Sequence, residues 1–209
     1  MTKVKICGIT NVEDALLSAG SGADALGFNF YENSPRYISP EKAREITDRL
    51  PEGVLRVGVF ANEQLDKIIE TAEIARLDAI QLHGDESPEF VSRMRDRTSA
   101  EIIKALRVTA EFEPEESIAY DADAILLDAF SPDELGGTGD TFDWEIAARV
   151  SAMIPRLYLA GGLKPENVYT AIEAVRPYAV DACSGLEIRK GKKDPGKIEM
   201  FIQSIRNAR

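Results

Sequence analysis

Two glycine-containing segments late in the chain have the residue types that hold a phosphate group. They are AGGLKPENV, which contains Gly161 and Gly162, and ACSGLE, which contains Ser184 and Gly185. Backbone N–H groups freed by glycine, together with the N-terminus of a following helix, bind anions. Either segment alone is equally typical of a tight turn between a strand and a helix. Because both follow short apolar runs, we expect them to form one phosphate site.

Other polar side chains end or follow earlier apolar runs. They are Cys7, Asn29, Arg36, His83, Arg107 and Asp128. A thiol and a carboxyl are both able to exchange protons with a substrate. The alternatives are a buried thiol that only packs and a carboxylate that only anchors a loop. The segment GGTGD at 136–140 is either a flap that closes over a ligand or a linker.

Short apolar runs rich in β-branched and aliphatic residues recur along the chain and predict strands. The eight predicted strands are 3–9, 25–30, 55–61, 79–84, 101–108, 124–130, 156–162 and 179–185. Helix start signals lie between them, at Asn11, Ser39-Pro40, Asn62, Ser87-Pro88 and Lys164-Pro165. The segment EFEPEESIAYD, at 111–121, has the weakest helical pattern and predicts a single turn.

Strands that alternate with helices at this spacing predict parallel βαβ units. Eight units close a (β/α)8 or TIM barrel, for which about 200 residues is the lower end. We therefore expect one α/β domain over residues 1–209, a single (β/α)8 barrel with short loops. An open doubly wound sheet is the alternative, but no GxGxxG follows the first predicted strand. Active sites of barrels lie where strands end, which is where the polar residues above are placed.

The charge balance argues against polyanionic partners. The chain has 36 Asp and Glu residues against 25 Lys and Arg, a net charge of -11, so nucleic acids and anionic membranes would repel it. No apolar stretch approaches the roughly 20 residues of a bilayer span, and no signal peptide is expected, which predicts a cytoplasmic protein. The two cysteines, Cys7 and Cys183, fit no disulfide framework or zinc spacing. We expect no metal and no cofactor.

Six segments match, in order, the motifs of one enzyme family. They are KICGIT (5–10), SPRYIS (34–39), QLHGDE (81–86), LLDA (126–129) with GGTGDTFDW (136–144), LAGGLKPENV (159–168) and VDACSGLE (180–187). Together they resemble phosphoribosylanthranilate isomerase, a barrel enzyme of tryptophan biosynthesis. The match runs from residue 3 to about residue 196, and each motif falls at a predicted strand end.

The resemblance implies an Amadori rearrangement, an intramolecular aldose–ketose isomerisation. N-(5-phosphoribosyl)anthranilate becomes 1-(2-carboxyphenylamino)-1-deoxyribulose 5-phosphate. An acid must protonate the furanose ring oxygen so that the ring opens to a Schiff base, and a base must remove the proton from C2. Carried over to this sequence, the general base is Cys7 and the general acid is Asp128. The implied partner is a small phosphosugar that carries anthranilate, and the family contains monomers and homodimers.

The resemblance also assigns residues that bind the substrate. Arg36 matches the clamp for the anthranilate carboxylate, a task that suits a guanidinium because it pairs bidentately with carboxylates. Asp181 is not assigned by the resemblance: because it lies two residues before Cys183 on the same face of a predicted strand, we expect it to orient substrate hydroxyls from the pocket floor. His83, the only histidine, is interpreted as structural or lining, because the acid and the base are already assigned.

Both catalytic groups need surroundings that shift their pKa values. The unperturbed pKa is about 8.5 for a thiol and about 3.9 for an aspartate. Lys5, on the same side of the first strand, is expected to favour the Cys7 thiolate, and burial is expected to raise the pKa of Asp128 beside Leu126 and Phe130.

The sequence departs from the family pattern at three places. Ala129 stands where serine or threonine is more usual, and Arg189-Lys190 replaces a proline-glycine pair. Cys183 stands where serine is usual, and closure of a barrel makes the first and last strands neighbours. The sequence leaves open whether the Cys183 sulfur lies near Cys7, and we hypothesise that the protein loses activity on oxidation more readily than a Cys183→Ser variant.

Two other functions stay open on sequence grounds. A phosphosugar aldolase would form a Schiff base with Lys5 or Lys104. A noncatalytic protein that binds a phosphate ligand could use the same scaffold, because a fold does not imply an activity.

Overall fold

β1 (Lys3–Ile6) pairs in parallel with a neighbour on each side, β2 (Ala25–Asn29) and β8 (Ala179–Ala182), and this closes the sheet. The other strands follow in chain order around the ring: β3 (Leu55–Phe60), β4 (Ala79–Leu82), β5 (Glu101–Val108), β6 (Ala124–Ala129) and β7 (Leu157–Leu159). The computed structural model of the chain describes residues 1–109, 111–129 and 144–208. The predicted (β/α)8 barrel is confirmed. The open-sheet alternative is wrong, because an open sheet leaves each end strand with one neighbour.

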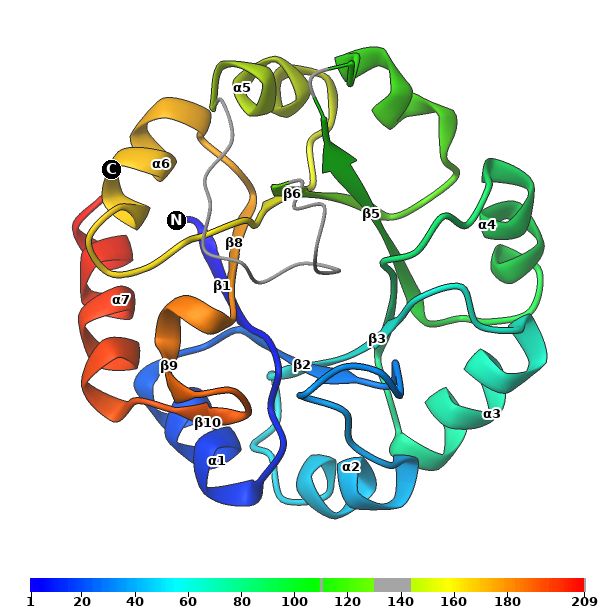
Figure 1. The fold of residues 1–209 in the computed structure, drawn as a ribbon, viewed down its shortest axis with the longest axis horizontal. Helices are drawn as coiled ribbons and strands as arrows, with labels where there is room; N and C mark the ends of the chain where they lie inside the picture. Colours follow the sequence, from blue (N-terminus) through cyan, green and yellow to red (C-terminus); the bar gives the residue numbers. More distant parts are fainter. Residues whose placement is uncertain (110, 130–143, 209) are drawn as a thin grey trace.

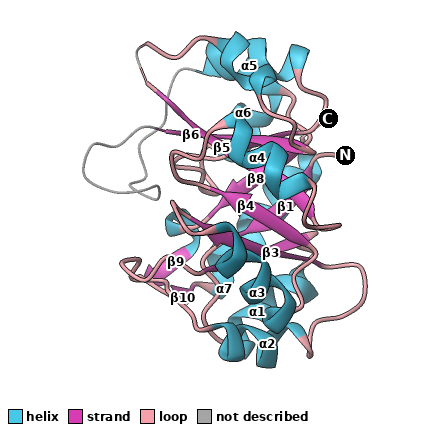
Figure 2. Cartoon of the chain, turned by 90° about the vertical axis from the view of Figure 1, so that its right-hand side faces the viewer, coloured by secondary structure: helices cyan, strands magenta, loops and turns pink. Residues whose placement is uncertain are grey.

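Helices surround the barrel and cover its outer face (Figure 1). They are α1 (Val12–Ser21), α2 (Pro40–Thr47), α3 (Leu65–Ala75), α4 (Pro88–Arg95), α5 (Trp144–Met153), α6 (Val168–Val175) and α7 (Pro195–Asn207). After β5 the chain forms only the 3-10 helix η1 (Pro114–Ala119), as its weak pattern predicted. A hairpin of β9 (Glu187–Arg189) and β10 (Lys192–Lys193), which the sequence analysis missed, stands at one end of the barrel (Figure 2).

Most predicted helix starts are confirmed by capping contacts. The side chains of Asn11, Ser39 and Ser87 each accept a hydrogen bond from a backbone N–H of the helix that follows. The predicted start at Asn62 is wrong. This residue has a positive φ of 54°, and its side chain joins the β3 and β4 loops by accepting a hydrogen bond from the Asp85 N–H. α3 begins later, at Leu65.

Alternate residues of each strand point into the barrel, and the others point toward the helices. In β6, Leu126 belongs to the interior cluster, whereas Ile125 and Leu127 belong to the layer between strands and helices. The interior is filled by apolar side chains such as Val57. The same alternation continues into the polar residues at the strand ends, so it decides which of them reach the cavity there.

One ion pair lies inside the barrel. Lys5 Nζ is 2.7 Å from Asp181 Oδ2, and the β1–β8 register places the two residues directly side by side. The Lys5 side chain is 0% exposed and that of Asp181 is 7% exposed. Burial disfavours the charge on Lys5, but the adjacent Asp181 carboxylate more than offsets this and holds the pKa of Lys5 above its ordinary value.

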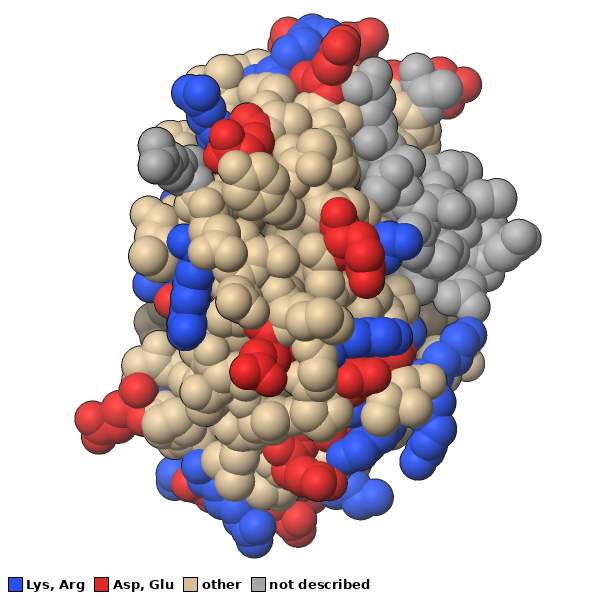
Figure 3. Space-filling model, turned by 90° about the vertical axis from the view of Figure 1, so that its left-hand side faces the viewer, with Lys and Arg blue, Asp and Glu red and all other residues tan. Residues whose placement is uncertain are grey.

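Charged side chains are dispersed over the face drawn in Figure 3. Acidic and basic groups are interspersed there and separated by uncharged areas. The described residues on this face therefore present no basic stripe of the kind that nucleic-acid binding needs. Within the described part of the chain, no helix is long and apolar enough to cross a membrane.

We expect Lys5→Met to destabilise the fold far more than Lys3→Met. The first substitution leaves Asp181 charged and unpaired in the barrel, which costs about 3–5 kcal/mol of unfolding free energy. Lys3 pairs with Asp24 at 2.6 Å, but its side chain is 52% exposed, and such pairs contribute about 0–1 kcal/mol. Urea unfolding of both variants measures the difference. Equal losses would show that the interior pair does not support the closed barrel.

Candidate active site

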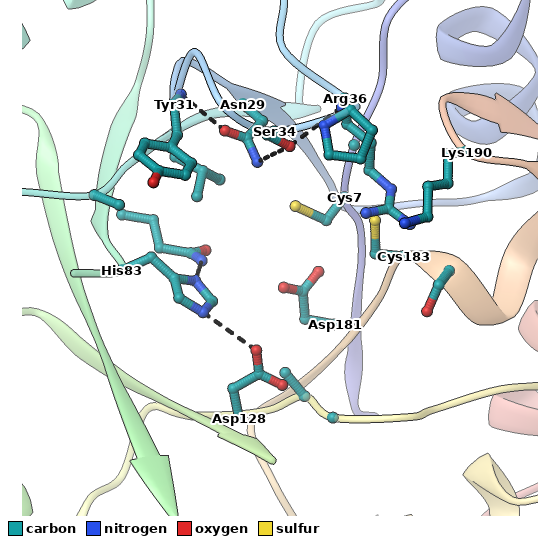
Figure 4. Close-up of a pocket in the computed structure, with 18 of the residues that line it drawn as sticks. Cys7, Asn29, Tyr31, Ser34, Arg36, His83, Asp128, Asp181, Cys183 and Lys190 are labelled. Carbon is teal, nitrogen blue, oxygen red and sulfur yellow. Dashed lines mark hydrogen bonds and ion pairs between the residues drawn. The ribbon is translucent and has the colours of Figure 1, made fainter. Parts of the chain in front are cut away.

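A cavity with a volume of about 600 Å³ lies where the barrel strands end. The residues that line it come from the ends of seven of the eight strands and from the loops that follow them, and β5 contributes none of those described. Of the predicted site residues, those that line it are Cys7, Arg36, Asp128, Gly161, Gly162, Asp181 and Ser184. Cys7 and Asp128 point into it from opposite sides, with the Asp181 carboxylate between them (Figure 4). The sequence prediction of a shared pocket for the thiol and the carboxyl is confirmed.

Asp128 is joined to a chain of polar side chains from β4. Its Oδ2 lies 3.2 Å from His83 Nε2, and His83 Nδ1 lies 2.8 Å from Gln81 Nε2. The Asp128 residue is 5% exposed. With Gln81 donating to Nδ1, the imidazole donates to an ionised Asp128, whereas rotation of the Gln81 amide lets the imidazole accept from a protonated Asp128. His83 therefore lines the cavity, as predicted, and also contacts the carboxyl.

Cys7 and Cys183 are neighbours across the β1–β8 junction. The Cys7 N–H donates to the Ala182 carbonyl at 2.9 Å, which puts the two thiols side by side at the cavity wall. A hydrogen bond between the thiols and burial both raise the pKa of Cys7, and Lys5 opposes them only in part. The same hydrogen bond is the main cause that lowers the pKa of Cys183 to about 7, with Lys193 and Arg36 assisting against burial.

The structure therefore places Cys183 beside Cys7, which the sequence left open. We expected Lys5 to favour the Cys7 thiolate, and its effect has that direction, but the pKa of Cys7 is raised overall. Lys5 lowers the pKa of Cys7, but Asp181, which pairs with Lys5, and the Cys183 contact raise it.

Arg36 is fixed by a carboxylate that the sequence analysis did not single out. Its Nε and Nη2 each donate to Glu187 at 2.9 Å, in a side-on bidentate pair. Glu187 also accepts from Lys193 Nζ at 3.2 Å and from the Gly191 N–H at 3.3 Å. The ion pair with Arg36 and the Lys193 charge outweigh burial and lower the pKa of Glu187. Only the end-on edge of the guanidinium is left for a ligand.

The two oxygens of the Asp181 carboxylate have different surroundings. Its Oδ2 accepts from Lys5 at 2.7 Å. Its Oδ1 is buried and has no hydrogen-bond partner among the described residues. Because a buried oxygen without a partner is costly, it suits a ligand that brings a donor.

The two glycine segments form adjoining turns. Gly161 and Gly162 have positive φ angles of 84° and 63°, which other residues rarely adopt. A Cβ at Gly185 would overlap the Leu163 carbonyl, so glycine there lets the short 3-10 helix η2 (Ser184–Leu186) pack against the other turn. In the described chain, the N–H groups of Gly162, Ser184 and Gly185 have no acceptor. These donors form a cradle suited to an anion.

Comparison with known proteins matches this chain to a family model. The model of the family described as N-(5'-phosphoribosyl)anthranilate (PRA) isomerase matches residues 4–204. The chain belongs to the N-(5'-phosphoribosyl)anthranilate isomerase family. Its activity is this isomerisation, a step of tryptophan biosynthesis.

Individual members of the family show how close the similarity is. The N-(5'-phosphoribosyl)anthranilate isomerase of Thermotoga maritima is 50% identical over 206 residues, covering 99% of each chain. That of Pelobacter propionicus is 50% identical over 209 residues, covering 100% of this chain and 98% of its own. The crystal structure from Thermotoga maritima superposes with a TM-score of 0.90 over 99% of each chain at 47% identity. The structure from Thermus thermophilus has a TM-score of 0.91 at 39% identity, and each chain is covered completely.

Membership of the isomerase family overturns the two other functions. The amine of an aldolase must be free, but Lys104 Nζ donates to Glu86 at 2.8 Å and to two backbone carbonyls. The Lys5 amine is buried and paired with Asp181. Arg107, a rim candidate, pairs with Asp85 at 3.4 Å. Neither the two lysines nor Arg107 lines the cavity.

Some predictions fall on residues outside the described part of the chain. These are the GGTGD segment at 136–140 and the environment of Asp128 at Phe130. Lys190, noted only as a departure from the family pattern, lines the cavity mouth beside Arg36 (Figure 4). Among the described residues, no group of three or more His, Cys, Asp or Glu side chains is arranged to hold a metal.

We expect peroxide to inactivate this isomerase faster than its Cys183→Ser variant. Peroxide converts a thiolate to a sulfenic acid and hydroxide, and the neighbouring thiol then attacks the sulfenic acid to form a disulfide and release water. Serine at 183 cannot complete the second step. Residual activity after timed exposure, followed by a reductant, measures this. Equal inactivation and equal recovery in both proteins would contradict it.

Proposed function

We propose that Cys7 is the general base and Asp128 the general acid of the isomerisation. The observation that carries this assignment is their convergence on one cavity from β1 and β6, two strands separated in the ring by β7 and β8. An acid must reach the sugar's ring oxygen while a base reaches C2, so the two groups have to face each other across the substrate. Among the residues lining the cavity, this thiol and this carboxyl satisfy that requirement.

The acid step belongs on the Asp128 side of the cavity. The carboxyl gives its proton to the furanose ring oxygen as the bond from that oxygen to C1 breaks, which leaves a Schiff base between C1 and the anthranilate nitrogen. His83 orients the carboxyl through the 3.2 Å contact to Oδ2. Gln81 in turn fixes the imidazole. We assign both as positioning residues, because they act through Asp128.

The base step belongs on the Cys7 side. The sulfur removes the proton from C2, and the electron pair moves toward the Schiff base to give an enolamine, which becomes the ketone. Gly27 keeps the sulfur accessible, because a Cβ there would lie 2.7 Å from Cys7 Sγ. Asp181 Oδ1, buried and without a partner among the described residues, is placed to accept a hydrogen bond from a sugar hydroxyl.

The ends of the substrate fit the remaining groups of the cavity. We assign the phosphate to the cradle of Gly161, Gly162, Ser184 and Gly185, whose N–H groups suit an anion. We assign the anthranilate carboxylate to the end-on edge of Arg36, because Glu187 already holds the side-on edge. A buried, oriented guanidinium loses little freedom when the carboxylate binds.

The relatives support the choice of ligand. One family member was solved in complex with reduced 1-(o-carboxyphenylamino)-1-deoxyribulose 5-phosphate, and it superposes with a TM-score of 0.87 at 46% identity. We infer that this chain binds the same phosphosugar carrying anthranilate. The Thermotoga maritima isomerase is described as dimeric. A monomeric or homodimeric state and a cytoplasmic location stay predictions for this chain.

Cys7→Ser and Asp128→Asn should each lower kcat by about 10²-fold or more, the usual contribution of general acid–base catalysis. The loss of substrate fluorescence as freshly made N-(5'-phosphoribosyl)anthranilate is consumed gives the rate. Asp66→Asn, at a side chain that is 83% exposed on α3, is the control and should keep the parent rate. Activity surviving in both catalytic variants would keep the isomerase and overturn the roles.

Glu187→Gln should raise KM by about tenfold or more while changing kcat less. The neutral side chain cannot hold both guanidinium donors as a charged pair, so Arg36 loses its fixed position, and hydrogen bonds to charged groups contribute about 1.5–3 kcal/mol. Steady-state kinetics give the split, at a temperature where circular dichroism shows both proteins folded. Glu173→Gln, exposed on α6, is the control. An unchanged KM would remove Arg36 from substrate binding.

A further inference from the structure

The two thiols of the chain form a pair at the cavity wall. Cys7 and Cys183 are the only cysteines, both are partly exposed, and both line the cavity. The β1–β8 register pairs Ile6 with Ala182 and so brings the next residue of each strand together. Figure 4 shows the two sulfurs side by side at the cavity wall, and this contact allows one proton to move between them.

The charged groups around the pair are unequally placed. Those that face it are Lys5 on β1, Arg36 after β2, Asp181 on β8, Glu187 on β9 and Lys193 on β10. Around Cys7, the positive charge of Lys5 is matched by Asp181 at 2.7 Å, and Arg36 interacts with both thiols but more strongly with Cys183. Cys183 faces two cations against one carboxylate. This arrangement favours negative charge on Cys183.

Contacts of Cys183 show how close these groups are. Lys193 Nζ lies 3.9 Å from its sulfur and 3.1 Å from its carbonyl oxygen, and the Lys193 side chain is 0% exposed. A Cβ at Gly8 would lie 2.8 Å from the sulfur and 2.7 Å from Arg36 Cδ, so the thiol and the guanidinium stem both close over that glycine. Glu187 Oε1 lies at nearly the same distance, 4.0 Å from the sulfur, but this oxygen is itself paired with Arg36 and Lys193.

We propose that Cys183 is a positioning residue that shares one proton with Cys7, so that the base of the reaction is a pair of thiols carrying a single negative charge. This inference rests on the proposed role of Cys7 as base. At rest, Cys7 holds the proton and donates it to the Cys183 thiolate. When substrate is bound, Cys7 passes that proton to Cys183 and its own sulfur takes the proton from C2.

Protons balance over the reaction. Ring opening moves one proton from Asp128 to the ring oxygen, and enolamine formation moves one from C2 to the thiol pair. Formation of the ketone adds a proton at C1, supplied by Cys7, and releases the proton of the C2 hydroxyl to Asp128. The pair then again holds one proton, and no oxidant, metal or other reactant is consumed.

Serine at position 183 separates this proposal from a packing role. A hydroxyl nearly matches the thiol in size and can hydrogen-bond to Cys7, but it does not ionise near neutral pH. A merely structural Cys183 is therefore replaced by serine without effect on the ionisation of Cys7. If Cys183 instead carries the negative charge, replacing it by serine changes the pKa of Cys7.

Ultraviolet absorbance of thiolates titrates the pair directly, because the chain has no other cysteine. In the parent, one thiolate should form with a titration midpoint near pH 7. This is because contact with Cys7 lowers the pKa of Cys183 to about 7. In Cys183→Ser the remaining Cys7 should ionise at least about one pH unit higher, and in Cys7→Ser the remaining Cys183 should also ionise higher. The proposal is overturned if Cys7 of the Cys183→Ser variant titrates at the same midpoint as the parent.

The pH dependence of kcat/KM supplies the second readout. Thiolate is lost as pH falls, so a higher midpoint shifts the acidic limb of the profile upward. Cys183→Ser should lose about tenfold below the parent midpoint and recover to within about twofold at alkaline pH, where Cys7 ionises unaided. Cys183→Ala should show the same shift, which excludes a fault specific to the serine hydroxyl. A uniform loss at every pH, or none, overturns the proposal.

The outcomes also separate this inference from the proposed function. If Cys7→Ser keeps full activity while the thiol titrations shift as expected, the proton-sharing pair stands and the role of Cys7 as base fails. If Cys7→Ser is inactive while Cys183→Ser keeps the parent titration and the parent pH profile, Cys7 remains the base and the pair fails.

Discussion

The parallel pairing of β1 with β8 is the contact on which the rest of the site depends. Closing the ring there brings Lys5 beside Asp181 and Cys7 beside Cys183, although these partners are separated by almost the whole chain. The interior ion pair and the two thiols therefore lie one above the other on the same two strands. The Lys5–Asp181 pair at the floor of the cavity thereby influences the pKa values of the two thiols at its wall.

The strict alternation of strand residues explains why so few side chains carry the chemistry. Only inward residues near the end of a strand can reach the cavity, and the apolar layer beneath excludes water from below. The hairpin of β9 and β10 adds what the barrel strands cannot supply. It carries Glu187 and Lys193, which hold Arg36 in place and put positive charge beside Cys183. The rim of the cavity is thus built partly by an element outside the eight-fold repeat.

Local signals predicted the parts of the fold that depend on local physics. Strand positions, the caps at Asn11, Ser39 and Ser87 and the weak turn before β6 follow from residue type and spacing. The cap at Asn62 failed because that side chain bonds to a loop more than 20 residues away instead of to its own helix. The roles of Cys7, Asp128 and Arg36 came from resemblance to a family. Glu187 and Gln81 escaped notice because their importance lies in contacts across the barrel, which sequence spacing does not reveal.

A crystal structure of this chain with reduced 1-(o-carboxyphenylamino)-1-deoxyribulose 5-phosphate tests the central claim most directly, because it shows where the reacting carbon lies. The account predicts the phosphate in the Gly162 and Ser184 turns, the benzoate on the end-on edge of Arg36, and C2 within roughly 4 Å of Cys7 Sγ. Asp128 should then lie on the opposite side of the sugar. A ligand that binds in the reverse direction, or that leaves C2 beyond reach of the Cys7 sulfur, would contradict the assignment of the base.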